Sequence, residues 1–177
     1  MLEGVGSEIS FLKRKIQRLE NGLALIPGTN IVALVTKFEE KYGRVRCQTI
    51  PGDNSLQRED VSAELSSADG SFYRMCVGVC LYLSRDRPDI VFPVKELASK
   101  MSRPTINSLQ CLKRLIGYLK VSRDYMVVLE QPIGGSGQVK QSAEHHWILE
   151  SFSDSDWSTN QEHRRSTSAG CHLLCGC

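Results

Sequence analysis

The first segment of the chain has an apolar pattern that fits two kinds of structure. Apolar residues recur at helical or heptad spacing, at Ile9, Leu12, Ile16 and Leu19. However, Glu20-Asn21-Gly22 is a turn signal with short apolar runs on both sides, which favours a β-hairpin over residues 10–26. The pattern alone leaves the two alternatives open.

A helix is predicted over residues 30–43, after the chain break at Pro27-Gly28. Thr29 or Asn30 can supply its N-cap, and Gly43 is placed to end it. Its apolar stripe consists of Ile31, Leu34, Val35 and Phe38. The spacing of this stripe predicts that one side of the helix packs against a core.

Three amphipathic helices are predicted in the middle of the chain. The first begins at a cap on Ser67 or Asp69, and its apolar side consists of Phe72, Met75, Cys76, Val79, Tyr82 and Leu83. The second runs from Pro88 to about Met101, and Pro93 is expected to bend its first turns. The third has a stripe made of Leu109, Leu112, Leu115, Ile116 and Leu119. Helices joined by such short breaks are expected to pack into a small bundle.

After residue 124 the apolar pattern changes to that of strands. Strands are predicted over residues 125–130, 145–153 and 169–174. The Gly-rich loop between the first two lacks the Gly-Lys-Ser/Thr sequence of a phosphate-binding loop. Strands, then about four helices, then antiparallel strands indicate the α+β class.

Composition adds a charge asymmetry to this picture. The 177 residues carry a formal net charge of +2, but residues 61–124 hold ten basic and six acidic side chains, whereas residues 125–177 hold three and six. A basic middle beside an acidic end fits a nucleic-acid-contacting part next to a metal-binding part, and an ordinary charged surface is the alternative. Seven cysteines without a secretion signal predict reduced thiols and an intracellular protein, in either the cytoplasm or the nucleus.

The acidic end contains a candidate metal ligand. The apolar run Trp147-Ile-Leu149 leads to the carboxylates Asp154 and Asp156, as in a strand that carries acidic residues to the edge of a sheet. Carboxylates are good ligands for Mg²⁺, and a two-metal hydrolase needs several of them. A turn aspartate that follows a strand is the alternative interpretation.

Several motifs then resemble one family in order and spacing. Tyr73-Arg-Met-Cys-Val-Gly78 and Leu81-Tyr-Leu-Ser-Arg-Asp-Arg-Pro-Asp-Ile90 resemble the YRxxVGxLxYLxxTRPDI stretch of copia-type LTR retrotransposon Pol polyproteins. Met101-Ser-Arg-Pro-Thr105 is similar to FMSxPT, and Lys113-Arg-Leu-Ile-Gly-Tyr-Leu-Lys120 to KRVLRYLKGT. Phe152-Ser-Asp-Ser-Asp-Trp157 with Arg164-Arg-Ser-Thr-Ser168 resembles YSDADW…RRSTSG.

The resemblance implies a domain plan. It implies the end of a reverse-transcriptase palm and the start of its thumb at residues 1–52, a linker at 53–67, a helical thumb or connection region at 68–124, and the start of a ribonuclease H-like sheet at 125–177. It favours the hairpin for the first segment. Residues 44–67 also have the polar, turn-rich composition of a linker.

The resemblance also implies roles for individual residues. Asp154 would be the first Mg²⁺-binding and catalytic carboxylate of ribonuclease H, and the remaining acidic ligands would lie beyond Cys177. The chain has no Tyr-x-Asp-Asp motif, so neither catalytic set is expected to be complete in it. The intact polyprotein would bind Mg²⁺ and an RNA–DNA template–primer, alongside the remaining Pol domains.

Four basic side chains on or beside the third middle helix are candidates for nucleic-acid contacts: Lys113, Arg114, Lys120 and Arg123. Each phosphate contact would add to the salt dependence of binding. A solvated helix face is the alternative for these charges. For the whole chain, the alternatives are a non-catalytic helical protein-interaction module and a decayed transposon remnant.

Overall fold

The computed structural model describes residues 7–11, 14–20, 22–26, 30–53, 60–130, 149–156 and 166–174. The strands are β1 (Glu8–Phe11), β2 (Arg14–Leu19), β3 (Gly22–Ile26), β4 (Val127–Glu130), β5 (Leu149–Asp156) and β6 (Thr167–Leu174). The helices are α1 (Asn30–Tyr42), α2 (Ser67–Leu83), the 3₁₀ turn η2 (Pro88–Ile90), α3 (Val91–Ser99) and α4 (Ile106–Val121). The predicted α+β class with about four helices is confirmed.

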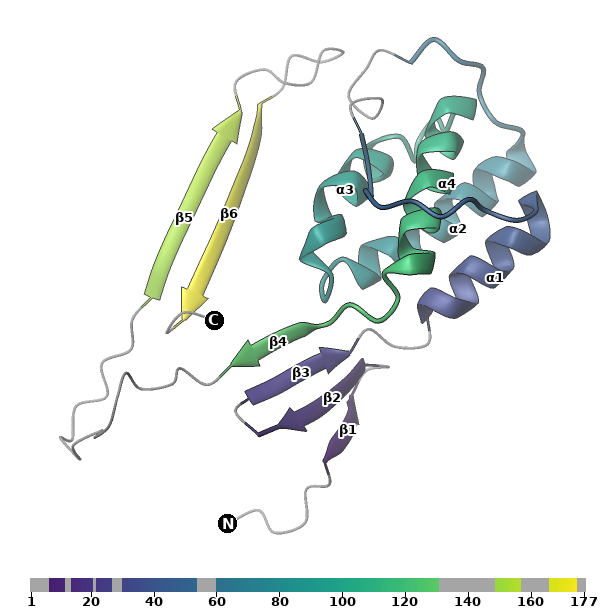
Figure 1. Ribbon diagram of the computed structural model, residues 1–177. Coiled ribbons are helices and arrows are strands. Elements are labelled where there is room, and N and C mark those ends of the chain that lie inside the picture. Colours follow the sequence, from purple (N-terminus) through teal and green to yellow (C-terminus); the bar gives the residue numbers. More distant parts are fainter. Residues whose placement is uncertain are drawn as a thin grey trace, which may run out of the picture.

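The N-terminal strands belong to a four-stranded antiparallel sheet in the order β1-β2-β3-β4 (Figure 1). The predicted hairpin is confirmed, since β2 and β3 pair with Leu19 opposite Gly22. The sheet gains a fourth strand from far along the chain, because Leu23 of β3 lies opposite Leu129 of β4. Residues 127–130 were expected to begin the C-terminal strands, and they instead complete the N-terminal sheet. The strands β5 and β6 pair with each other as a separate two-stranded sheet.

The core lies among the four helices, beyond one end of this sheet (Figure 1). Most of the predicted apolar stripes of α1 and α4 is buried, with Phe38 and Leu115 both 0% exposed, while Val35 and Leu109 are partly buried. On α2 the buried side is centred on Tyr73, Cys76, Val77 and Cys80, whereas the predicted residues Phe72, Met75 and Val79 are only partly buried. The reason is that α2 contacts α3 and α4 as well as α1, so its most buried side faces all three neighbours.

The second predicted helix is divided at Ile90. The 3₁₀ turn η2 precedes α3, which begins at Val91, so Pro93 lies in the first turn of α3. Backbone N–H groups in a first turn have no partner within the helix, and proline is therefore accommodated there. Where a single helix with a bend in its first turns was expected, the structure has a 3₁₀ turn and an α-helix that meet at Ile90.

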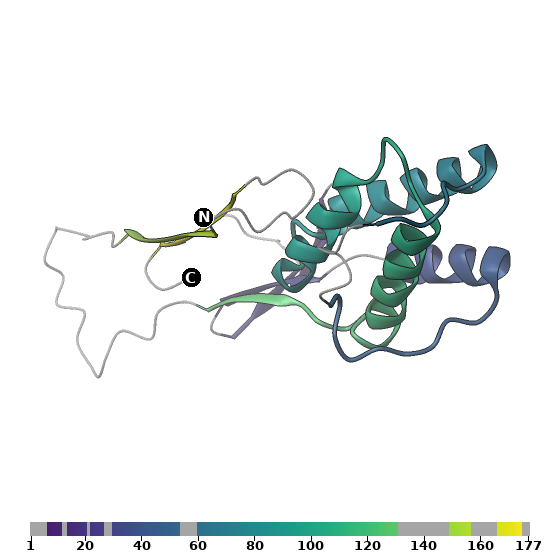
Figure 2. The same ribbon diagram turned by 90° about the horizontal axis from the view of Figure 1, so that it is seen from above.

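Part of the predicted linker packs against the bundle. In both views the segment after α1 turns back across α4 (Figure 1, Figure 2). Gly43 turns the chain with a φ of 76°, and Val45 is buried at 2% exposed. The backbone N–H of Gln48 donates to the carbonyl of Gly117 in α4 at 3.2 Å. Residues 44–48 are therefore part of the packed fold.

The remaining expectations from composition concern cysteines and membranes. The cysteines that the structure describes, Cys47, Cys76, Cys80, Cys111 and Cys171, are free thiols. Cys76 and Cys80 are buried in the core, and burial raises the pKa of the Cys76 thiol to about 11. None of the described helices is long and apolar enough to cross a membrane.

Candidate nucleic-acid interface and metal ligand

The candidate metal ligand Asp154 lies in the interior of β5, opposite Ala169 of β6, and its side chain is exposed. Alternation along a strand places Glu150 on the same face as Asp154, with Phe152 between them. At about 3.3 Å per residue the two carboxyl-bearing positions are about 13 Å apart, which is too far for one ion to bridge.

No metal-binding site is assembled around Asp154 in the described part of the chain. Within the described ranges, no group of three or more His, Cys, Asp or Glu side chains is close enough to hold a metal ion. Ser151 and His172 form a cross-strand hydrogen bond of 2.9 Å between Oγ and Nδ1 on the strand pair. That contact occupies a ring nitrogen of His172 and supports strand pairing.

The four predicted nucleic-acid-binding residues occupy α4 and the turn after it. The side chain of Lys113 is exposed, and it has no ion-pair partner among the described residues. The other three each meet a carboxylate: Arg114 Nη1 lies 3.1 Å from Asp53, Lys120 Nζ lies 2.7 Å from Glu39, and Arg123 Nε lies 3.4 Å from Asp124.

Glu39 connects Lys120 to the end of α1. Its Oε1 accepts hydrogen bonds from Lys120 Nζ at 2.7 Å and from the backbone N–H of Val45 at 2.8 Å. The hydrogen bond from Lys120, followed by that from Val45, holds the pKa of Glu39 below its usual value. The same carboxylate thus fixes the segment after α1 and positions a cation of α4.

Two further cations lie in this region that the sequence analysis did not select. Arg44 and Arg46 flank the buried Val45, and both side chains are exposed. Their segment was predicted to be a linker, so its charges were not assigned to a surface. The alternation of basic and apolar residues over Arg44-Val45-Arg46 was the available signal, because alternation is typical of an extended segment with one buried side.

The position of Gly117 explains how this segment reaches α4. A Cβ atom at Gly117 would lie 2.3 Å from the carbonyl oxygen of Arg46 and 3.3 Å from Cγ1 of Val45. Only glycine permits this contact between a helix and a backbone without displacement. Lys113 and Lys120 lie four residues before and three after Gly117, so the helical period places them on the same side of α4 as Arg46.

The motif Arg87-Pro88-Asp89 has a structural role in the fold. Arg87 is 1% exposed, and its guanidinium donates to Asp89 at 2.9 and 2.7 Å. It also donates to the carbonyl and the hydroxyl of Ser122, the C-cap of α4, at 2.9 and 2.8 Å. The hydroxyl of Tyr118 donates to Asp89 at 2.7 Å. Burial opposes ionisation of Asp89, but the hydrogen bonds from Arg87 and Tyr118 outweigh it and keep the pKa of this carboxyl low.

Comparison with curated proteins connects the chain to transposons. It is 28% identical over 146 residues to an uncharacterized mitochondrial protein of Arabidopsis thaliana, AtMg00810, a match that covers 80% of this chain and 55% of that protein. It is 32% identical over 99 residues to the retrovirus-related Pol polyprotein from transposon RE1 of Arabidopsis thaliana, covering 56% of this chain and 6% of the polyprotein. The chain thus spans about half of the first relative and a small part of the second.

A further relative is matched over most of its length. The uncharacterized mitochondrial protein AtMg00240 of Arabidopsis thaliana is 30% identical over 95 residues, which are 53% of this chain and 74% of that protein. No protein-family model matches the chain, and no solved structure matches it. Together with the motifs of residues 73–170, these similarities show that the chain belongs to the family of retrovirus-related Pol polyproteins of transposons, consistent with the copia-type resemblance.

Proposed function

We propose that this chain is the part of a copia-type Pol polyprotein that connects reverse transcriptase to ribonuclease H and contacts the RNA–DNA template–primer. The observation that carries the proposal is a group of cations on α4 and the two segments next to it. We call this group the α4 basic surface, and it consists of Arg44, Arg46, Lys113, Arg114, Lys120 and Arg123.

The chemistry of this surface suits a phosphate backbone. Arginine and lysine side chains bind phosphate oxygens and release condensed counterions from the nucleic acid. Lys113, Arg44 and Arg46 are exposed. Arg114 and Lys120 are held against carboxylates, but partly exposed ion pairs contribute only about 0–1 kcal/mol each. A phosphate can therefore replace Asp53 or Glu39 at small free-energy cost.

The intramolecular ion pairs also limit the motion of these side chains. Arg114 Nε is buried and has no hydrogen-bond partner among the described residues, while its Nη1 lies 3.1 Å from Asp53. A guanidinium that is already ordered loses less conformational entropy when it binds phosphate. Contacts to phosphate and sugar would fix the position of the duplex without base-specific contacts. A connection region that binds any template–primer needs contacts of this kind.

We extend the proposal to Asp154 as the first Mg²⁺ ligand and catalytic carboxylate of ribonuclease H in the intact polyprotein. The side chains described here do not make a Mg²⁺ site by themselves, because no group of three or more His, Cys, Asp or Glu side chains is assembled among them. Further acidic ligands from the rest of the polyprotein would be required. The isolated chain is therefore expected to leave an RNA–DNA hybrid uncleaved in the presence of Mg²⁺. Robust cleavage that Asp154→Asn abolishes would contradict this expectation.

The salt dependence of hybrid binding tests the proposed surface. Fluorescence anisotropy with a labelled RNA–DNA hybrid gives the slope of log K against log salt concentration, and the slope is expected to be near −0.9 for each phosphate neutralised. Replacing Lys113 or Arg46 by glutamine should each reduce the slope by about 1. Lys37→Gln is the matched control, because Lys37 is an exposed lysine of α1 outside the surface.

Two results would contradict the proposal. One is hybrid binding whose slope is unchanged in both Lys113→Gln and Arg46→Gln. The other is a reduction in slope in Lys37→Gln of the same size as in those variants, because binding would then follow total charge and not this surface.

A further inference from the structure

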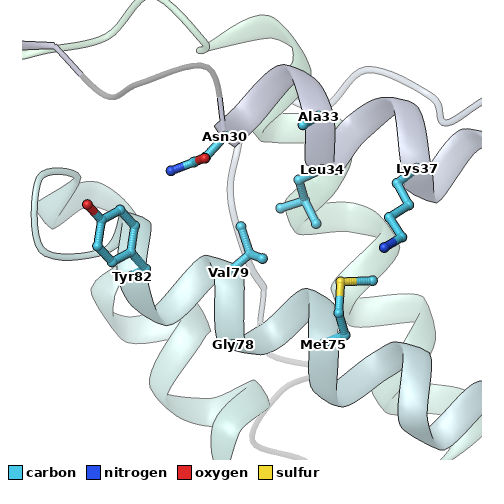
Figure 3. Close-up of a pocket in the computed structure, with 8 residues that line it drawn as sticks. All are labelled: Asn30, Ala33, Leu34, Lys37, Met75, Gly78, Val79 and Tyr82. Carbon is cyan, nitrogen blue, oxygen red and sulfur yellow. The ribbon is translucent and has the colours of Figure 1, made fainter. Parts of the chain in front are cut away.

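An apolar groove lies between α1 and α2, and none of the residues that line it belongs to the α4 basic surface. Its volume is about 700 Å³. Leu34 of α1 and Val79 of α2 face each other across it, with Met75 beside them (Figure 3). This volume is within the usual range of about 300–1,000 Å³ for binding sites. The fold thus leaves an apolar concavity open between two helices.

The two ends of the groove differ in charge. Lys37 extends from α1 toward α2 near Met75 at one end, and Asn30 and Tyr82 lie at the other end (Figure 3). Lys37 is exposed and has no ion-pair partner among the residues that the structure describes. A single ammonium group beside apolar walls is complementary to an apolar segment that carries one carboxylate.

Gly78 forms part of the wall of this groove, in the interior of α2. A glycine in a helix interior costs about 1 kcal/mol relative to alanine. Gly117 of α4 is required by a close backbone contact, but a Cβ atom at Gly78 would meet no atom within 4 Å. The described fold therefore gives no reason for glycine at this position. A partner whose backbone approaches α2 closely supplies one.

The shape of the groove distinguishes between classes of partner. A nucleic-acid duplex is convex and polyanionic, so it does not fill an apolar concavity between two helices. An amphipathic helix does, because apolar side chains at positions i, i+3, i+4 and i+7 enter such grooves together. Gly78 allows the backbone of a third helix to come close, as small residues do at helix contacts.

We propose that the groove between α1 and α2 binds an amphipathic helix of a partner protein, with its apolar face against Leu34, Met75 and Val79 and a carboxylate paired with Lys37. This interaction site is separate from the nucleic-acid surface and does not depend on it. It gives the helical bundle a protein-binding role in addition to its proposed role on the template–primer.

The test uses two synthetic peptides of about 18 residues, long enough to form helices. Both carry leucine at helical spacing on one face; one has glutamate at the edges of that face, and the other has lysine. Binding to the full chain is followed by fluorescence anisotropy. The glutamate peptide is expected to bind about tenfold more tightly than the lysine peptide, which corresponds to about 1.4 kcal/mol.

Three variants separate the contributions of the groove. Lys37→Glu should reverse the preference between the peptides, because it reverses the charge at one end of the groove. Gly78→Leu should weaken both peptides by at least about tenfold by filling the wall, and Gly78→Ala is a milder variant that should retain the fold. Lys113→Glu is the matched control and should leave the peptide preference unchanged. Hybrid binding should be unaffected by Gly78→Leu, so failure of this proposal is distinguishable from failure of the proposed nucleic-acid function.

Several results would overturn the proposal. Equal binding of the two peptides, or binding of neither, would contradict the carboxylate-bearing helix as occupant. Unchanged peptide binding in both Gly78 variants would show that the peptides bind elsewhere. Self-association of the chain that Gly78→Leu abolishes, without peptide binding, would assign the groove to a second copy of this chain instead.

Discussion

The replacement of Gly117 by alanine tests how the segment after α1 is held against α4. The new Cβ atom would lie 2.3 Å from the carbonyl oxygen of Arg46 and 3.1 Å from Cγ of Gln48. A backbone carbonyl cannot move aside alone, because Val45 next to it is buried and Gln48 donates a hydrogen bond to Gly117 at 3.2 Å. The segment is therefore expected to detach from α4.

The size of the effect follows from what detachment removes. Exposing Val45 costs about 2 kcal/mol. Losing the hydrogen bonds from Gln48 to Gly117 and from Val45 to Glu39 costs about 1 kcal/mol each. Alanine is favoured over glycine within a helix by about 1 kcal/mol, which offsets part of the loss. The net expectation is a destabilisation of about 3 kcal/mol.

The assay is urea unfolding of the full chain, followed by circular dichroism of the helices. With a slope near 2 kcal/mol per molar urea, Gly117→Ala should lower the midpoint by roughly 1.5 M. Gly78→Ala is the matched control, since it is the same substitution in a helix interior where a Cβ atom meets nothing within 4 Å. It should raise the stability by about 0.5–1 kcal/mol.

The two variants are expected to change stability in opposite directions. If Gly117→Ala is as stable as the unmodified chain, residues 44–48 do not pack on α4 as described. If both variants gain the same stability, helix propensity alone accounts for both positions, and the steric argument at Gly117 is refuted.

The other predictions concern the remaining contacts between segments. Arg87→Ala should destabilise the fold by about 3 kcal/mol in urea unfolding, because it removes the partner of a partly buried carboxylate, that of Asp89. The control is Arg85→Ala, which changes an exposed arginine and should alter the stability by no more than about 0.5 kcal/mol. Equal effects of the two substitutions would contradict the hydrogen-bond network of Arg87. Hydrogen bonds from Lys41, then Tyr42 and Ser66, lower the pKa of Asp69 to about 2. The ionised Asp69 carboxylate therefore stabilises the fold fully above its unfolded pKa of about 3.9, and this contribution is lost as the pH falls through about 2. The stability difference between the unmodified chain and Asp69→Asn should therefore shrink between pH 4 and about 2 in thermal unfolding, and a constant difference would contradict it.

Much of the local structure could be predicted because local and tertiary preferences agree. The stripe of α1 is apolar at helical spacing and faces the core, so pattern and burial coincide at Leu34 and Phe38. The turn at Glu20 identifies the hairpin of β2 and β3. Thr105 and Ser108 form a capping box at the start of α4, where the sequence has a helix-breaking Pro104 just before.

The contacts that the sequence did not predict connect distant segments. The pairing of Leu23 with Leu129 depends on the helices returning the chain to the sheet, and no local pattern encodes that return. The contact of Arg46 with Gly117 depends on the same packing. Arg87 was not recognised as a buried residue because a charged side chain is buried only when it is paired, and one of its partners, Ser122, lies 35 residues away at the end of α4.

The candidate sites were likewise predicted in their residue types but not in their long-range contacts. Residue type and motif order identified Asp154 and the cations of α4, but the sequence did not reveal that three of these cations meet carboxylates of the same chain. Arg44 and Arg46 were missed because their segment has a turn-rich composition. The groove beside Gly78 was missed because it arises between two helices that are separate in sequence.

Chemical footprinting of lysines tests most directly whether the α4 basic surface contacts nucleic acid. The full chain is acetylated with and without an RNA–DNA hybrid, and the modification of individual lysines is measured by mass spectrometry. We expect the hybrid to protect Lys113 and Lys120, Lys37 to remain reactive, and added salt to remove the protection. Equal reactivity of Lys113 with and without the hybrid, or protection of Lys37 in its place, would contradict this expectation.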